Sequence, residues 1–170
     1  LKSGAIIIGT MAAAWLPYLI QNGPLWVFEM FGRTAGGYKY ASVNSFNFFA
    51  MLGLNWVPDN NTFLSISYFT WGIIFLIVVV LLAGYIYFKI SDKYKTLPYL
   101  LALMLSVCVV VFTVRMHERY MFPAIIFSLI VAFMDNSRFM LGIHGTLTVT
   151  SFLNSLIILG RHNSGGSISD

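Results

Sequence analysis

Long apolar runs alternate with short polar segments along this chain of 170 residues. A membrane-spanning helix needs about 20 mostly apolar residues. Five runs without Asp, Glu, Lys or Arg approach that length: 4–20, 68–88, 97–114, 121–134 and 139–159. The pattern therefore predicts five spanning helices. The run 121–134 is short and reaches spanning length only if Arg119 and Tyr120 lie at the membrane interface.

A longer segment, residues 21–67, separates the first two predicted spans. It contains an apolar stretch, 43–57, that is interrupted by Asn44, Asn47 and Asn55. Amide side chains are costly in lipid unless they are hydrogen-bonded, and this stretch is short for a span. We therefore expect an interfacial or re-entrant helix packed on protein, in preference to a sixth span.

Composition supports a membrane protein. Hydrophobic residues make up 58% of the chain and charged residues 9%, whereas a soluble domain has about 25% charged residues. The basic residues are scattered, so nucleic-acid binding is excluded as a function class. The predicted fold class is an all-α membrane protein, a polytopic bundle of about five spans plus the interfacial or re-entrant helix.

The predicted domain organisation is one helical transmembrane domain, residues 1–160, followed by a polar, flexible tail, residues 161–170. The chain begins with Leu1, and its first twenty residues lack the layout of a cleavable signal peptide. We expect it to be the C-terminal part of a longer protein.

Lysines suggest an orientation, because basic residues are enriched in cytoplasmic loops. Lys89, Lys93 and Lys95 crowd the loop after residue 88, and Lys2 precedes the first run. Placing these lysines inside puts segment 21–67, the turn at 115–120 and the C-terminus on the outer face. Counting arginines as well makes the two sides equal, so the orientation rests on lysine alone.

Four ionisable groups lie together in the turn between two apolar runs: Arg115, His117, Glu118 and Arg119. Pro123 follows, and it favours a helix break before it, with Phe122 outside helical geometry and a new helix beginning near the proline. If the preceding residues are helical, the two arginines share one face. Guanidinium groups beside a helix N-terminus suit a phosphate.

A structural interpretation of this turn has about equal weight. Charged residues at the end of a spanning helix often extend into the lipid headgroups, and Arg–Glu pairs there can serve the fold alone. Glu118 could fix an arginine or provide a carboxylate ligand for a divalent cation. His144, inside the last apolar run, is better explained as a hydrogen-bonded contact between helices than as a ligand.

The motifs RMHERYMFP (from Arg115) and VNSFNFFAMLG (from Val43), with a Trp-x-Pro-Asp turn ending at Asp59, carry a resemblance. They are similar to a family of bacterial membrane proteins related to the mannosyltransferases of GPI-anchor synthesis, in the GT-C superfamily. The resemblance covers residues 38–123, and its most specific part is HERY-x-x-P. Phe49 and Ser45 depart from it, where tryptophan and alanine are expected.

The resemblance implies a glycosyltransferase that takes a sugar, mannose at the family level, from a polyprenyl-phosphate donor on the outer face of a bacterial plasma membrane. The acceptor would be a glycan or a protein. The acidic catalytic residue of such enzymes lies in an earlier loop, so none is assigned in this chain, and cofactors are left open beyond a divalent cation.

The candidate residues follow from this hypothesis. The donor-phosphate ligands are Arg115, His117 and Arg119, with Glu118 and Tyr120 in supporting positions. Candidate sugar contacts are Asn44, Asn47, Trp56 and Asp59, although a structural role is the better explanation of each one singly. Two alternatives remain: a transporter or channel subunit whose path these charges line, and a membrane scaffold without catalytic activity.

Overall fold

The computed structural model describes residues 2–23, 25–90 and 93–163, and the chain divides into two units, 1–38 and 39–170. The first unit contains helices α1 (Lys2–Asn22) and α2 (Trp26–Gly37). Tyr18 of α1 stacks on Trp26 of α2, with ring centroids 5.5 Å apart. On the exposed surface of α2, Arg33 lies 3.7 Å from Glu29, one turn away.

The second unit begins with an irregular segment that contains one helical turn, α3 (Phe48–Met51), and a two-stranded hairpin, β1 (Thr62–Phe63) and β2 (Ile66–Ser67). Four longer helices follow: α4 (Tyr68–Ile90), α5 (Leu97–Phe112), α6 (Phe122–Asp135) and α7 (Arg138–Asn163). A short 3-10 helix, η1 (Glu118–Met121), joins α5 to α6.

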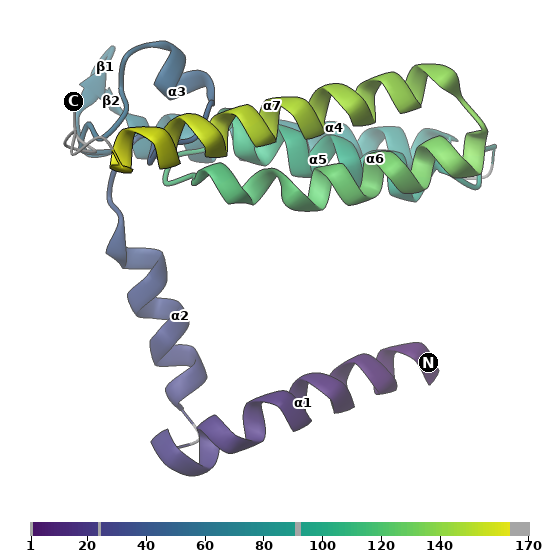
Figure 1. Ribbon diagram of the computed structural model, residues 1–170, viewed down its shortest axis with the longest axis horizontal. Coiled ribbons are helices and arrows are strands. Elements are labelled where there is room, and N and C mark those ends of the chain that lie inside the picture. Colours follow the sequence, from purple (N-terminus) through teal and green to yellow (C-terminus); the bar gives the residue numbers. More distant parts are fainter. Residues whose placement is uncertain (1, 24, 91–92, 164–170) are drawn as a thin grey trace. The chain divides into compact units, whose positions relative to one another are not determined.

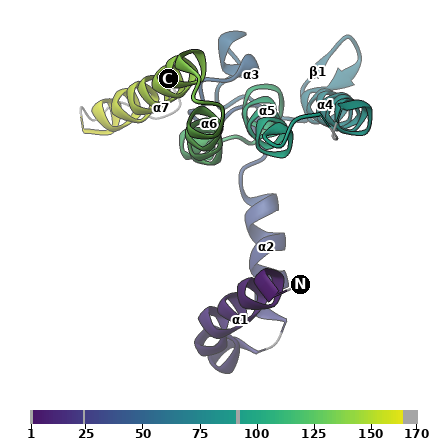
Figure 2. The ribbon, with the colours of Figure 1, turned by 90° about the vertical axis from the view of Figure 1, so that its right-hand side faces the viewer.

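The four long helices of this unit run side by side in chain order, each packed on the next (Figure 1). Seen end on, they form a row rather than a closed bundle (Figure 2). Because consecutive helices are antiparallel, the irregular segment, the η1 turn and the C-terminal end of α7 gather at one end of the row (Figure 1). The lysine-rich α4–α5 connection lies at the other end.

Small side chains let the helices approach closely. Ala124, Ser128, Val131 and Ala132 form the buried face of α6 between its two neighbours. At the first turns of α4, Gly72 is buried against the backbone of Val114. Close approach through small residues is the usual way for apolar helices to pack in a membrane, where burial of apolar groups gives little driving force.

Three of the described helices are long and apolar enough to cross a membrane: Gly4–Asn22, Tyr68–Ile90 and Arg138–Gly160. Few of their residues are buried within the structure, and most of their exposed side chains are apolar, as expected for helices that face lipid. The chain is therefore mostly helical and has the composition and helices of an integral membrane protein. Helices α5 and α6 are apolar but shorter, with 16 and 14 residues.

Three features differ from the sequence prediction. The interfacial or re-entrant helix expected over residues 43–57 is reduced to the single turn α3, because Asn44, Gly53 and Trp56 adopt left-handed backbone angles that interrupt a helix. Helix α2 lies in a segment for which no helix was predicted. Helix α7 continues to Asn163, three residues into the predicted tail, and residues 164–170 lie outside the described part.

Candidate functional site

The charged turn is irregular where it leaves α5. Thr113 is extended, and Arg115 has φ of 63°, a left-handed conformation that is unfavourable for a side chain of its size. The predicted break is therefore present, and α6 begins beside Pro123, which lies in its first turn. Phe122 differs from the prediction, because its angles (φ −56°, ψ −42°) are helical.

Arg115 is held by Asp59. Its Nε donates to Asp59 Oδ2 at 2.6 Å, and the guanidinium carbon lies 4.6 Å from the ring centroid of Phe69. The Asp59 side chain is 6% exposed and that of Arg115 27%. In addition, the backbone N–H of Arg115 donates to the carbonyl of Tyr40. The candidate sugar contact Asp59 thus orients an arginine.

This arrangement corrects the expected arginine pair. Arg115 is not helical and points to Asp59, whereas Arg119 lies in η1 and exposes its side chain. The two residues therefore do not share a helix face. None of the hydrogen bonds and ion pairs found among the described residues involves the Arg119 side chain. Arg119 is the basic group of the turn that is presented outward.

His117 is buried and 9% exposed. Its backbone forms bridges with Val43 and Asn44, and its ring contacts Tyr120 edge to face at 5.3 Å. Burial lowers the pKa of His117 below its usual 6.5, and the charge of Arg119 lowers it further, against a smaller opposite effect of Glu118. The imidazole is therefore neutral near pH 7, a form in which one ring nitrogen is a donor and the other an acceptor.

Three residues of the irregular segment form a polar cluster. The Asn44 side-chain oxygen accepts from Trp56 Nε1 at 2.9 Å and from Asn55 Nδ2 at 3.1 Å. The Asn44 backbone N–H donates to Asn55 Oδ1 at 2.8 Å. Asn44 and Trp56 both have positive φ, 57° and 59°. These hydrogen bonds stabilise a loop in the segment where the sequence predicted a helix.

Asn47 has a capping role. Its side-chain oxygen accepts from the backbone N–H of Ala50 at 2.9 Å, which begins α3. Its Nδ2 donates to the carbonyl of Thr113 at 3.4 Å, and the side chain is buried. Asn47 thus connects the irregular segment to the end of α5. The contacts of Asn44 and Asn47 agree with the structural role that the sequence analysis preferred for each of them.

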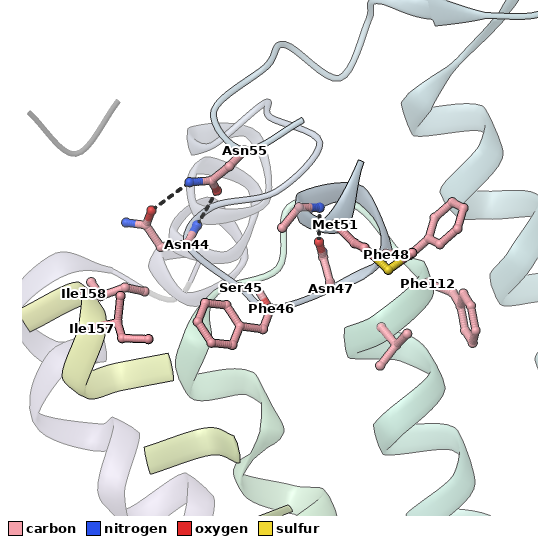
Figure 3. A pocket seen from close by; sticks show the side chains of 12 residues that line it. Asn44, Ser45, Phe46, Asn47, Phe48, Met51, Asn55, Phe112, Ile157 and Ile158 are labelled. Carbon is pink, nitrogen blue, oxygen red and sulfur yellow. Dashed lines mark hydrogen bonds between the residues drawn. The ribbon is translucent and has the colours of Figure 1, made fainter. Parts of the chain in front are cut away.

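An apolar pocket of about 710 Å³ lies beside this segment. Its walls come from the 44–55 loop, the C-terminal end of α5 and the last turns of α7 (Figure 3). Phe46, Phe112 and Ile157 are among its apolar lining residues, and Asn44, Asn47 and Asn55 are among its polar ones. Because Asn44 is bridged to His117, the pocket adjoins the charged turn through residues 43–46.

The sequence analysis did not assign Asn55, Phe69 or Ile157 to the site. Asn55 was visible as a polar interruption of an apolar stretch and could have been found by that signal. Phe69 and Ile157 are apolar residues in apolar runs, so nothing local distinguishes them. They reach the site only because α4 begins, and α7 ends, at the same end of the helix row.

His144 joins two helices, as predicted. Its Nδ1 lies 3.0 Å from Ser128 Oγ and 3.2 Å from the carbonyl of Ile125, so it connects α7 to α6. In the part of the chain that the structure describes, no three His, Cys, Asp or Glu side chains are grouped to hold a metal ion. Among the described residues, Glu118, which the sequence suggested as a ligand for a divalent cation, therefore belongs to no such group.

Comparison with known proteins gave no match to a family model, a curated protein or a solved structure. The resemblance to the GT-C glycosyltransferases thus rests on the motifs quoted above.

Proposed function

We propose that this chain is the part of a polytopic membrane glycosyltransferase that holds a polyprenyl-phosphate sugar donor. One observation carries the proposal: a large apolar pocket with amides on its wall adjoins a charged turn that presents Arg119. An isoprenoid chain needs apolar surface, a phosphate needs charged donors, and sugar hydroxyls suit amides. The three chemistries meet within one end of the helix row.

The phosphate would bind at the charged turn. Arg119 is the exposed guanidinium there, and neutral His117 can donate to a phosphate oxygen or to the sugar. Arg115 is the second guanidinium of the turn, and its ion pair with Asp59 fixes its position. Tyr120, which is 39% exposed and contacts His117, forms a side wall.

The reaction follows from these positions. The hydroxyl of a glycan or protein acceptor attacks the anomeric carbon, the bond from that carbon to the phosphate oxygen breaks, and polyprenyl phosphate leaves. Arg119 stabilises the negative charge that grows on the leaving phosphate. An acidic group outside this chain takes the proton of the acceptor hydroxyl. Mannose as the transferred sugar follows from the resemblance alone.

The membrane placement belongs to the same proposal. Helices α5 and α6 are about 24 Å and 21 Å long, which is shorter than the roughly 30 Å hydrocarbon core, but they run alongside the longer helices α4 and α7. Helices α1, α4, α5, α6 and α7 would then make five crossings. The lysine-rich end of the row then faces the cytoplasm, and the charged turn faces the outer side of a bacterial plasma membrane.

Replacing Arg119 in the full-length protein tests this proposal. We expect Arg119→Ala to lower kcat/KM for transfer from a polyprenyl-phosphate sugar by about 100-fold or more, as loss of a transition-state donor does. Arg119→Lys keeps the charge and should retain part of the activity. Arg33→Ala, at an exposed arginine of α2, is the matched control. Unchanged transfer by Arg119→Ala would contradict the phosphate role.

A further inference from the structure

Helix α2 has a charged side and an apolar side, and it takes no part in the site described above. Glu29 and Arg33 lie one turn apart on the charged side, and their side chains are 65% and 73% exposed. With about 3.6 residues per turn, Val27, Phe28 and Phe31 lie on the opposite side of the helix. Such a separation of charged and apolar residues is typical of a helix at a boundary between water and an apolar phase.

The apolar side of α2 includes large exposed side chains. Phe28 is 74% exposed and Phe31 57%, whereas Val27 beside them is buried. Leu25, immediately before the helix, is 65% exposed. Apolar side chains gathered on one helix face are unfavourable in water, and such a face usually marks a surface that contacts protein or lipid.

Helix α1 determines which of these partners lies next to α2. It is long and apolar enough to cross a membrane, and none of its spanning window is buried within the structure. Trp15 and Tyr18, near its C-terminal end, are of the residue types enriched at membrane–water interfaces. Helix α1 ends at Asn22 and α2 begins at Trp26. Because four residues reach at most about 14 Å, α2 begins close to the membrane surface.

The junction between the helices turns α2 away from the direction of α1. Gly23 has φ of 91°, a left-handed conformation that glycine adopts without strain. Tyr18 stacks on Trp26 with ring planes 6° apart, which connects the last turns of α1 to the first turn of α2. Both ribbon views show α2 leaving α1 at a steep angle (Figures 1 and 2). A helix that leaves a spanning helix in this way runs along the membrane surface instead of across it.

We propose that α2 is an interfacial helix whose Phe28 and Phe31 side chains insert among the lipid chains just below the headgroups. The charged side, with Glu29 and Arg33, faces water. The partner is the bilayer itself, because α1 holds α2 at its surface and a boundary between lipid and water suits both sides of the helix. The proposal rests on α1 and α2 and does not depend on the glycosyltransferase hypothesis.

Nitroxide spin labels on single cysteines of the full-length protein test this proposal. The labelled variants are Phe28→Cys, Phe31→Cys, Glu29→Cys and Arg33→Cys, with Cys108 replaced by alanine and any other native cysteine also replaced. All four side chains are exposed, so a label fits without displacing the helix. The protein is placed in lipid nanodiscs of phosphatidylcholine and phosphatidylglycerol. Accessibility of each label is measured to oxygen, which is enriched in lipid, and to a neutral nickel chelate, which stays in water.

We expect the ratio of oxygen to nickel accessibility to be several-fold higher at positions 28 and 31 than at positions 29 and 33. Leu81→Cys, at a 68% exposed residue in the middle of α4, provides the reference for lipid, and Lys39→Cys provides the reference for water. High nickel accessibility at all four positions would show that α2 lies in water. Low accessibility to both reagents at 28 and 31 would show that this side packs on protein. Either result would overturn the proposal.

Discussion

Gly72 offers the sharpest test of how the charged turn is positioned. A Cβ atom added there would lie 3.1 Å from the backbone nitrogen of Val114 and 3.5 Å from Thr113 Cα. Backbone atoms cannot rotate away as a side chain can, and the next residue, Arg115, is fixed by Asp59. Gly72→Ala must therefore displace either α4 or the turn.

Two opposing contributions set the change in stability that we expect for Gly72→Ala. Overpacking costs about 1–3 kcal/mol, and the better helix propensity of alanine returns up to about 1 kcal/mol. Gly84, in the same helix, is the matched control, because nothing lies within 4 Å of its added Cβ. Gly84→Ala gains the propensity term alone. The two variants should then differ in stability by about 1–3 kcal/mol, with Gly72→Ala the less stable.

Thermal unfolding in nanodiscs measures this difference. For a chain of this size, 1 kcal/mol corresponds to about 2–4 °C in Tm, so Gly72→Ala should melt at least about 2 °C below Gly84→Ala. Under the proposed function, Gly72→Ala should also lower sugar transfer by the full-length protein, because the turn that carries Arg119 moves. Equal melting temperatures for the two variants would refute the tight contact between α4 and the turn.

Three further substitutions test separate parts of the chain by unfolding experiments. Asp59→Ala leaves Arg115 without its carboxylate and should destabilise the chain by up to about 3 kcal/mol; a loss below about 0.5 kcal/mol would contradict a structural ion pair. The pKa of His117 is lower in the folded chain than the usual 6.5, so just below pH 6.5 the unfolded chain binds more protons than the folded one. The contribution of His117 to stability is therefore fully present above pH 6.5, and it decreases as the pH falls from 6.5 towards the folded-state pKa. His117→Phe replaces the imidazole with an aromatic ring that does not titrate, and it should reduce the stability difference between about pH 7.5 and about pH 5.5; an unchanged difference would mean that other groups cause the pH dependence. Leu64, with φ of 52° at the hairpin tip, is strained, and Leu64→Gly should stabilise the chain by about 0.5–1 kcal/mol, whereas a loss would mean that its side chain is held by a contact.

The long helices could be predicted from the sequence because one property, the length of an apolar run, decides them. The predicted run 68–88 corresponds to α4 (Tyr68–Ile90), and 139–159 lies within α7 (Arg138–Asn163). The break before Pro123 was predictable for a similar reason, since proline restricts its own neighbourhood. These features depend on local chemistry, which the sequence displays directly.

The site was less predictable because its contacts join distant residues. Arg115 and Asp59 are 56 positions apart, and either residue alone is compatible with a solvated charge. The predicted helix over 43–57 does not form for a local reason. Asparagine side chains bond to nearby backbone groups and favour turns, and this effect outweighs the apolar pattern of the stretch. Helix α2 was missed because Glu29 and Arg33 interrupt its apolar pattern, although four-residue spacing suits them to one helix face.

Photo-labelling tests the central proposal most directly. A polyprenyl phosphate with a photoreactive group on its isoprenoid chain would be cross-linked to the full-length protein in nanodiscs, and the labelled peptides identified by mass spectrometry. We expect label on the 44–55 loop and on α7 near Ile157, competed by an unlabelled polyprenyl-phosphate sugar, and competed at least about tenfold less effectively in Arg119→Ala. Label spread over the lipid-facing surface of α4, unaffected by that competitor, would contradict the account.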